Sequence, residues 1–101
     1  MKKLFAPKPK PFQTGQLIVT DAVVDAMEDP RFRSFVYACY IRYCSNDWGD
    51  LDKTAFKENR RNIKHGGNLG GYYIDEVSGR KVVILTPAQR DRTVVCMADE
   101  K

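Results

Sequence analysis

The stretch from Pro30 to Asn46 constrains the fold of this chain most strongly, because its large apolar side chains recur at spacings of three and four. This period matches one side of an α-helix, so the stretch predicts a long amphipathic helix. Asp29 before Pro30 is a typical helix start, since the carboxylate accepts free N–H groups and proline needs none. We expect a central core helix whose apolar face is formed by Phe32, Phe35, Val36, Cys39, Tyr40 and Tyr43 and widened by Tyr37 and Ile41.

Two shorter helices and a strand are predicted around this central helix. The β-branched run over residues 15–20 predicts a strand that ends at Thr20 or Asp21, where a short helix begins. One apolar side of that short helix is expected to hold Val23, Val24 and Met27. A third helix is expected from a cap at Asp50 or Asp52 to about Lys64, and Gly66 or Gly67 ends it.

The last third of the chain changes to a strand pattern. Residues 72–77 and 80–86 flank Ser78-Gly79 and predict a β-hairpin, and the strand with the run 82–85 is apolar on both faces, as an inner strand should be. One helical turn from Thr86 to Arg90 and a final strand over 93–97 complete the pattern. The predicted fold class is α+β, with three helices packed on a small, mainly antiparallel sheet in the order β-α-α-α-β-β-β.

Length and composition favour a single domain. The 101 residues match the usual size of one domain, and residues 1–12, with four lysines, three prolines and no acid, predict a flexible basic arm before a domain over 13–101. The three cysteines form no C-x-x-C pair and are expected to be reduced core residues. We find neither an export signal nor a run of about 18 apolar residues, so we expect a cytoplasmic protein without a membrane span.

A basic stripe on the third helix is the strongest candidate surface. The chain carries a net charge of +4, and Glu58 interrupts the stripe without pairing most of its cations. Such a stripe suits the phosphates of nucleic acid, whereas a plain solvated helix face is the alternative. The stripe consists of Lys53, Lys57, Arg60, Arg61 and Lys64, supported by the arm lysines Lys2, Lys3, Lys8 and Lys10.

A cluster of acids precedes the third helix. Asp47, Asp50 and Asp52 lie within six residues, and carboxylates this close can hold Mg²⁺ or Ca²⁺ when a loop turns their oxygens inward. The spacing is not that of an EF-hand, and turn formation and helix capping explain the same residues. We favour the structural interpretation and keep the metal site as an alternative.

No catalytic constellation follows from the residues. The glycines over 66–71 close a helix and open a strand, which is the wrong order for a phosphate-binding loop. His65, the sole histidine, stands at a helix end that favours a positive charge, and no serine or cysteine has a recognisable nucleophile motif. We therefore expect no catalytic residue and no resident cofactor.

Three segments in this order resemble a family of small bacterial proteins carried on plasmids and mobile elements. They are residues 46–52 (NDWGDLD), residues 58–73, and residues 84–94, and the resemblance runs from about Gln13 to Met97. Members are labelled plasmid-related proteins or type I restriction enzyme M subunits. Because the chain has no N-P-P-Y/F tetrapeptide and no glycine-rich turn after a strand, methyltransferase chemistry is not expected. The resemblance implies an intracellular accessory role on a mobile element.

Together these patterns predict a non-enzymatic accessory or inhibitor protein that binds another macromolecule, such as a restriction or CRISPR complex of the host. The expected partner is a protein or a protein–nucleic-acid complex, and the oligomeric state is left open. Two alternatives remain: a nucleic-acid-binding module that uses the basic stripe, and a small metal-dependent hydrolase centred on the acidic cluster.

Overall fold

Seven regular elements follow the predicted order in the computed structural model, which describes residues 12–100. The fold class is confirmed as α+β, with three helices and a four-stranded mixed sheet. A short 3-10 turn, η1, follows the last strand. The elements are β1 (Gln16–Val19), α1 (Asp21–Ala26), α2 (Pro30–Cys44), α3 (Lys53–His65), β2 (Leu69–Ile74), β3 (Lys81–Thr86), β4 (Arg92–Met97) and η1 (Ala98–Glu100).

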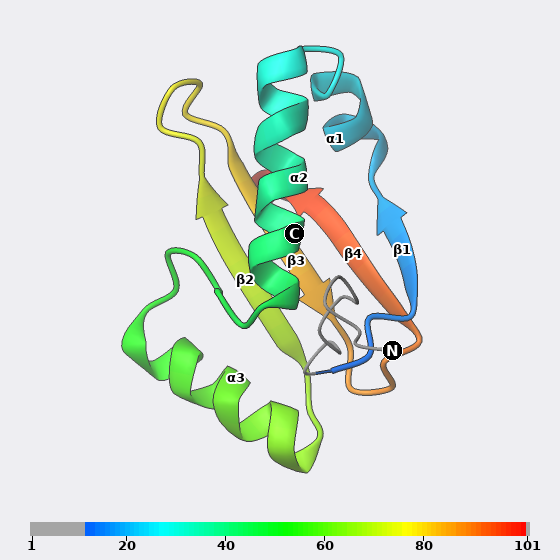
Figure 1. Cartoon of the computed structure of the whole chain (residues 1–101), viewed down its shortest axis with the longest axis vertical. Helices are drawn as coiled ribbons and strands as arrows, with labels where there is room; N and C mark the ends of the chain where they lie inside the picture. Colours follow the sequence, from blue (N-terminus) through cyan, green and yellow to red (C-terminus); the bar gives the residue numbers. More distant parts are fainter. Residues whose placement is uncertain (1–11, 101) are drawn as a thin grey trace, which may run out of the picture.

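The sheet has the strand order β1-β4-β3-β2, with β1 and β2 at its edges (Figure 1). The pairs β2–β3 and β3–β4 are antiparallel, and β1 lies parallel to β4 with Gln16 beside Arg92. The prediction of a mainly antiparallel sheet is therefore confirmed, as is the inner position of the strand containing residues 82–85. The parallel pairing was not predicted, and it places the first strand beside the last.

Helices α1 and α2 cover one face of the sheet, and α3 lies beside β2 (Figure 1). The predicted face of α2 packs on that sheet face, where Phe32 and Tyr43 are fully buried. Tyr37 and Ile41, expected to widen this face, are instead 58% and 67% exposed. Successive helical residues are about 100° apart, so both side chains point away from the line that joins Phe32 to Tyr43. That part of the prediction is wrong.

A chain of buried hydroxyl groups ties α2, the sheet and the segment before β1 together. The Thr93 hydroxyl donates to the Thr14 carbonyl at 2.7 Å, so it accepts from Thr86, which in turn accepts from Tyr43, each at 2.7 Å. Burial raises the pKa of Tyr43 to about 12, which keeps this hydroxyl a donor. Because each of the three hydroxyl groups has a partner, the network stabilises the core and leaves none of these hydroxyls unpaired.

Several boundaries differ from those we predicted, and β2 ends at Ile74 instead of Val77. Phe12, assigned to the flexible arm, is 8% exposed, and its ring centroid lies 5.4 Å from that of Tyr43, so it belongs to the core. The rest of the arm lies outside the described residues. Strand β2 starts earlier than predicted, at Leu69, because Gly70 and Gly71 continue the pairing with β3. Residues 87–90 form a turn rather than a helical turn.

The remaining details concern α1 and the cysteines. Val23 is fully buried, but Val24 is 51% exposed, since α1 has only six residues and presents a narrow face to the sheet. All three cysteines are free: Cys39 and Cys96 are buried and Cys44 is half-buried. Burial raises the pKa of Cys39 to about 12, as expected of a core thiol. Over residues 12–100, no helix combines the length and the apolar character needed to cross a membrane.

Candidate nucleic-acid interface

Helix α3 begins and ends where its sequence signals predict. The carboxylate of Asp52 accepts the N–H of Ala55 at 2.8 Å, which satisfies a free donor of the first turn. Gly66 follows the helix with a φ of 81°, and its N–H bonds the Asn62 carbonyl. Only glycine adopts this backbone region without strain, so the helix ends at His65.

Polar side chains hold α3 against the outer edge of β2. Asn59 is 5% exposed, and its amide bonds both backbone groups of Gly70: Nδ2 donates to the carbonyl at 2.6 Å, and Oδ1 accepts the N–H at 3.2 Å. Asn62 Nδ2 donates to the Asn68 carbonyl at 2.8 Å. The side-chain amide of Asn59 thus takes the place of the backbone groups that a neighbouring strand would offer to Gly70. Helix α3 is therefore anchored to β2 without a large apolar face.

Arg90 secures the far end of α3. Its guanidinium donates to the carbonyls of Asn62, Gly67 and Pro87, which come from the helix, the loop after it and the β3–β4 turn. Arg90 also has a φ of 58°, an unusual backbone state for a residue other than glycine. This clamp had no sequence signal, because an arginine in a polar turn resembles any surface arginine.

The predicted basic stripe forms the outer face of α3. At about 100° per residue, its five cations fall within an arc of about 100° that lies opposite Asn59. All five are exposed, and none takes part in the hydrogen bonds or ion pairs found among the described side chains. Phe56, which is 39% exposed, borders this arc. The structure therefore brings together Lys53, Lys57, Arg60, Arg61 and Lys64 as one surface, which we call the basic face.

Most arginines elsewhere in the described chain have partners. Arg42 pairs with Asp47 at 2.7 Å, and Arg92 pairs with Asp91 at 3.2 Å. The Arg80 guanidinium lies 4.9 Å from the ring centroid of Phe32. Arg33 and Lys81 have no such contact, but they lie on different elements. Over residues 12–100, unpaired positive charge is thus concentrated on the basic face.

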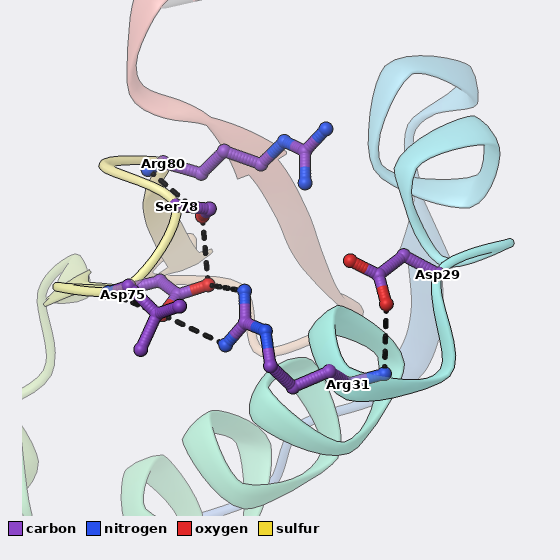
Figure 2. Close-up of polar contacts among 6 residues, drawn as sticks. Asp29, Arg31, Asp75, Ser78 and Arg80 are labelled. Carbon is purple, nitrogen blue, oxygen red and sulfur yellow. Dashed lines mark hydrogen bonds and ion pairs between the residues drawn. The ribbon is translucent and has the colours of Figure 1, made fainter.

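The most buried ion pair lies at the other end of the sheet and stabilises the hairpin (Figure 2). Arg31, in the first turn of α2, donates from both terminal nitrogens to Asp75, at 3.1 and 2.7 Å. Asp75 is 3% exposed and also accepts from the Ser78 hydroxyl at 2.7 Å. The guanidinium holds the pKa of this carboxyl well below its usual value. These contacts fix the β2–β3 loop to α2 and leave no free group for chemistry.

The acidic cluster is divided among three structural tasks. Asp47 pairs with Arg42, which lowers the pKa of Asp47, and it accepts the Gly49 N–H at 3.1 Å. Asp50 accepts the N–H of Ile74 at 3.2 Å, and Asp52 caps α3. Within residues 12–100, no three His, Cys, Asp or Glu side chains are placed to share a metal ion. These contacts account for the carboxylates by turn formation and capping.

The turn that contains these acids covers the outer edge of β2. The Tyr72 N–H donates to the Trp48 carbonyl at 3.0 Å, and the Tyr72 carbonyl accepts the Asp50 N–H at 2.6 Å. Tyr73 is fully buried, and its hydroxyl donates to the Asp47 carbonyl at 2.7 Å. We call residues 47–50 the DWGD turn; it serves as a short parallel strand beside β2.

No catalytic set appears among the described side chains. His65 is exposed at the end of α3 and makes no side-chain hydrogen bond there. An open pocket of about 590 Å³ lies between the hairpin and η1, lined by both Lys81 and Asp99. It contains no buried polar group aimed inward, and its charges are mixed. The basic face is therefore the better candidate for function.

Comparisons with known proteins return no relative of this chain. No family model matches the sequence. No curated protein matches it either. No solved structure matches it. The case for function therefore depends on the residues and their geometry.

Proposed function

We propose that this protein acts by binding another macromolecule, without catalysing a reaction, and that the basic face of α3 binds the phosphate backbone of nucleic acid. The observation that carries this proposal is the set of five exposed cations on one side of one helix, none of them with an acidic partner among the described residues. Unpaired lysines and arginines release counterions when they meet phosphates, which is the main source of non-specific affinity.

The way α3 is anchored supports the same proposal. Asn59, Asn62 and Arg90 hold the helix through its inner side, so its outer side needs no contact with the rest of the protein. With 13 residues, α3 is about 20 Å long, enough to follow several phosphates. The exposed ring of Phe56 beside the cations also suits stacking on an unpaired base. These features favour binding to the phosphate backbone of the nucleic acid over recognition of its base sequence.

The accessory or inhibitor role on a mobile element, including a role against host restriction or CRISPR complexes, depends on the family resemblance alone. None of the described contacts bears on it, and it stays a prediction. A nucleic-acid-binding surface is compatible with such a role, because those complexes hold nucleic acid. The metal-dependent hydrolase has no supporting observation, since its carboxylates are engaged by Arg42, Ile74 and Ala55.

The test is a salt titration of binding to fluorescent duplex DNA, single-stranded DNA and duplex RNA, measured by anisotropy. If the five cations each meet a phosphate, the logarithm of the affinity should fall with that of the salt concentration with a slope of about −4. The double variant Lys57→Gln/Arg61→Gln should weaken binding and make this slope shallower by about 2.

The matched control is Arg33→Gln/Lys81→Gln, which removes the same charge from two cations outside α3 that also have no ion pair. This control should keep the wild-type slope. An equal loss of affinity in both double variants would indicate an effect of net charge and no interface on α3. Absence of salt-sensitive binding to all three nucleic acids would contradict the proposal.

A further inference from the structure

The outer edge of β1 has no strand partner among residues 12–100. The N–H groups of Gln16 and Thr20 donate to carbonyls of the β4 strand and the turn before it, so even-numbered residues of β1 face β4. Backbone groups alternate along a strand, so the N–H and C=O of Leu17 and Val19 point away from the sheet. No labelled element lies beyond β1 in Figure 1. Leu17 is 46% exposed and Ile18 is 38% exposed.

We propose that β1 pairs with β1 of a second copy of this chain, in antiparallel orientation about a twofold axis through Ile18. In this register Leu17 lies opposite Val19 of the other copy. Each N–H of this pair then donates to the carbonyl of its partner, so all four outward groups of each copy are satisfied. The proposal concerns an edge different from that of α3 and does not depend on the proposed function.

The side chains of β1 fit this pairing. On one face of the sheet Leu17 would pack against Val19 of the second copy, and on the other the two Ile18 side chains would meet across the axis. Cross-strand apolar pairs of this kind stabilise a sheet. Ile18 also continues the row it forms with Val94 and Leu85, which becomes one apolar row across both copies.

Charge favours a second copy as the occupant. No residue from Gly15 to Thr20 is charged, so antiparallel pairing places no like charges opposite each other. Among the described residues, the cluster of positive charge of each copy lies on α3, beside β2 at the far side of the sheet from β1 (Figure 1). The two basic faces would therefore stand at opposite flanks of the dimer, far beyond the screening length of about 8 Å at physiological salt.

The first test is the mass of the full chain in solution by sedimentation equilibrium. The proposal predicts a concentration-dependent rise from 11.6 kDa to twice that mass. Ile18→Lys should place two ammonium groups against each other at the axis and shift the dimer midpoint to roughly tenfold higher concentration or more. Ile74→Lys is the matched control, because Ile74 is also 38% exposed and lies on the other edge strand. It should dimerise like the wild type.

A charge-pairing experiment tests the register. Ile18→Lys and Ile18→Glu should each dimerise more weakly than the wild type, and an equimolar mixture of the two should recover the dimer, because residue 18 meets residue 18 in the proposed arrangement. Should neither variant fold by circular dichroism, amide exchange in the wild type decides: the Leu17 and Val19 amides should gain protection as the concentration rises.

Three results would overturn the proposal. The first is a wild-type chain that remains at 11.6 kDa at every concentration. The second is an equal weakening of the dimer by Ile18→Lys and by Ile74→Lys. The third is a monomer whose Leu17 and Val19 amides become protected only when an unrelated extended peptide is added, which would assign the edge to a partner strand.

Discussion

The two edges of the sheet differ in how their backbone groups are satisfied. At β2 the N–H and C=O of Gly70 bond Asn59, those of Tyr72 bond the DWGD turn, and the N–H of Ile74 bonds Asp50. At β1 the outward groups of Leu17 and Val19 have no partner among the described residues. Exposed edges promote association of sheets, and proteins usually cover them. The contrast indicates that β2 is closed and β1 is available.

The covered edge also explains the placement of charge. The DWGD turn and Asn59 attach α3 to β2 through polar contacts, which leaves the outer side of the helix free to carry cations. The open edge carries no charge at all. One side of the molecule is therefore suited to a polyanion, and the other is suited to a neutral strand.

The largest effect is expected from breaking the covered edge at Gly49. Gly49 has a φ of 75°, and a Cβ there would lie 2.2 Å from the Tyr72 carbonyl oxygen. Gly49→Ala should therefore lower the free energy of unfolding by about 3 kcal/mol or more. Urea denaturation measures this loss. Gly79→Ala, with a φ of 78° and nothing within 4 Å, is the control and should cost about 1 kcal/mol.

Removal of the side-chain partner of Gly70 should have the next largest effect. Asn59→Leu leaves the N–H and C=O of Gly70 without their bonds in a half-buried position, at a cost of about 2–3 kcal/mol. The Gly70 amide should also exchange faster with solvent. An unchanged exchange rate at Gly70 would mean that Asn59 does not close this edge.

A moderate, pH-dependent effect is expected at the hairpin beyond β2. The folded pKa of Asp75 is depressed by Arg31, so the ion pair stabilises the protein above the unfolded pKa of about 4 and this stability is lost as pH falls below it. Asp75→Asn should cost about 1–3 kcal/mol at neutral pH and flatten the acid limb of the stability profile. Asp47→Asn, at a carboxylate that is 49% exposed, should have a smaller effect on the stability at neutral pH and on the acid limb. A wild-type acid limb in Asp75→Asn would contradict this assignment.

The smallest effect should come from the open edge. Leu17→Thr alters a side chain that is 46% exposed on a strand whose outer groups are unpaired, so the monomer should change in stability by less than about 0.5 kcal/mol. Denaturation at low protein concentration isolates this value from association. A loss comparable to that of Asn59→Leu would show that β1 is covered.

Local signals made most of the fold predictable. The Asp29-Pro30 start, the Asp52 cap and the Gly66 stop each act within one turn, and the structure confirms all three. The parallel pairing of β1 with β4 was missed, because it joins residues about 75 positions apart and leaves no local pattern. Tyr37 and Ile41 are apolar, which suggested burial, but their angular positions on α2 place them on the exposed side.

The candidate site was predictable only in part. The basic face follows from residue spacing, since cations that recur every three and four positions share one side of a helix. Its anchor did not follow, because Asn59 and Arg90 bind backbone groups of distant segments that the sequence does not bring together. The acidic cluster was interpreted correctly as turn and cap, but its role in covering β2 depends on the sheet order.

The most direct test of this account is residue-resolved amide exchange of the dilute wild-type protein. We expect slow exchange at Gly70, Tyr72 and Ile74, whose N–H groups are bonded at the covered edge, and fast exchange at Leu17 and Val19. Equally slow exchange at both edges in dilute solution would contradict the contrast on which the account depends.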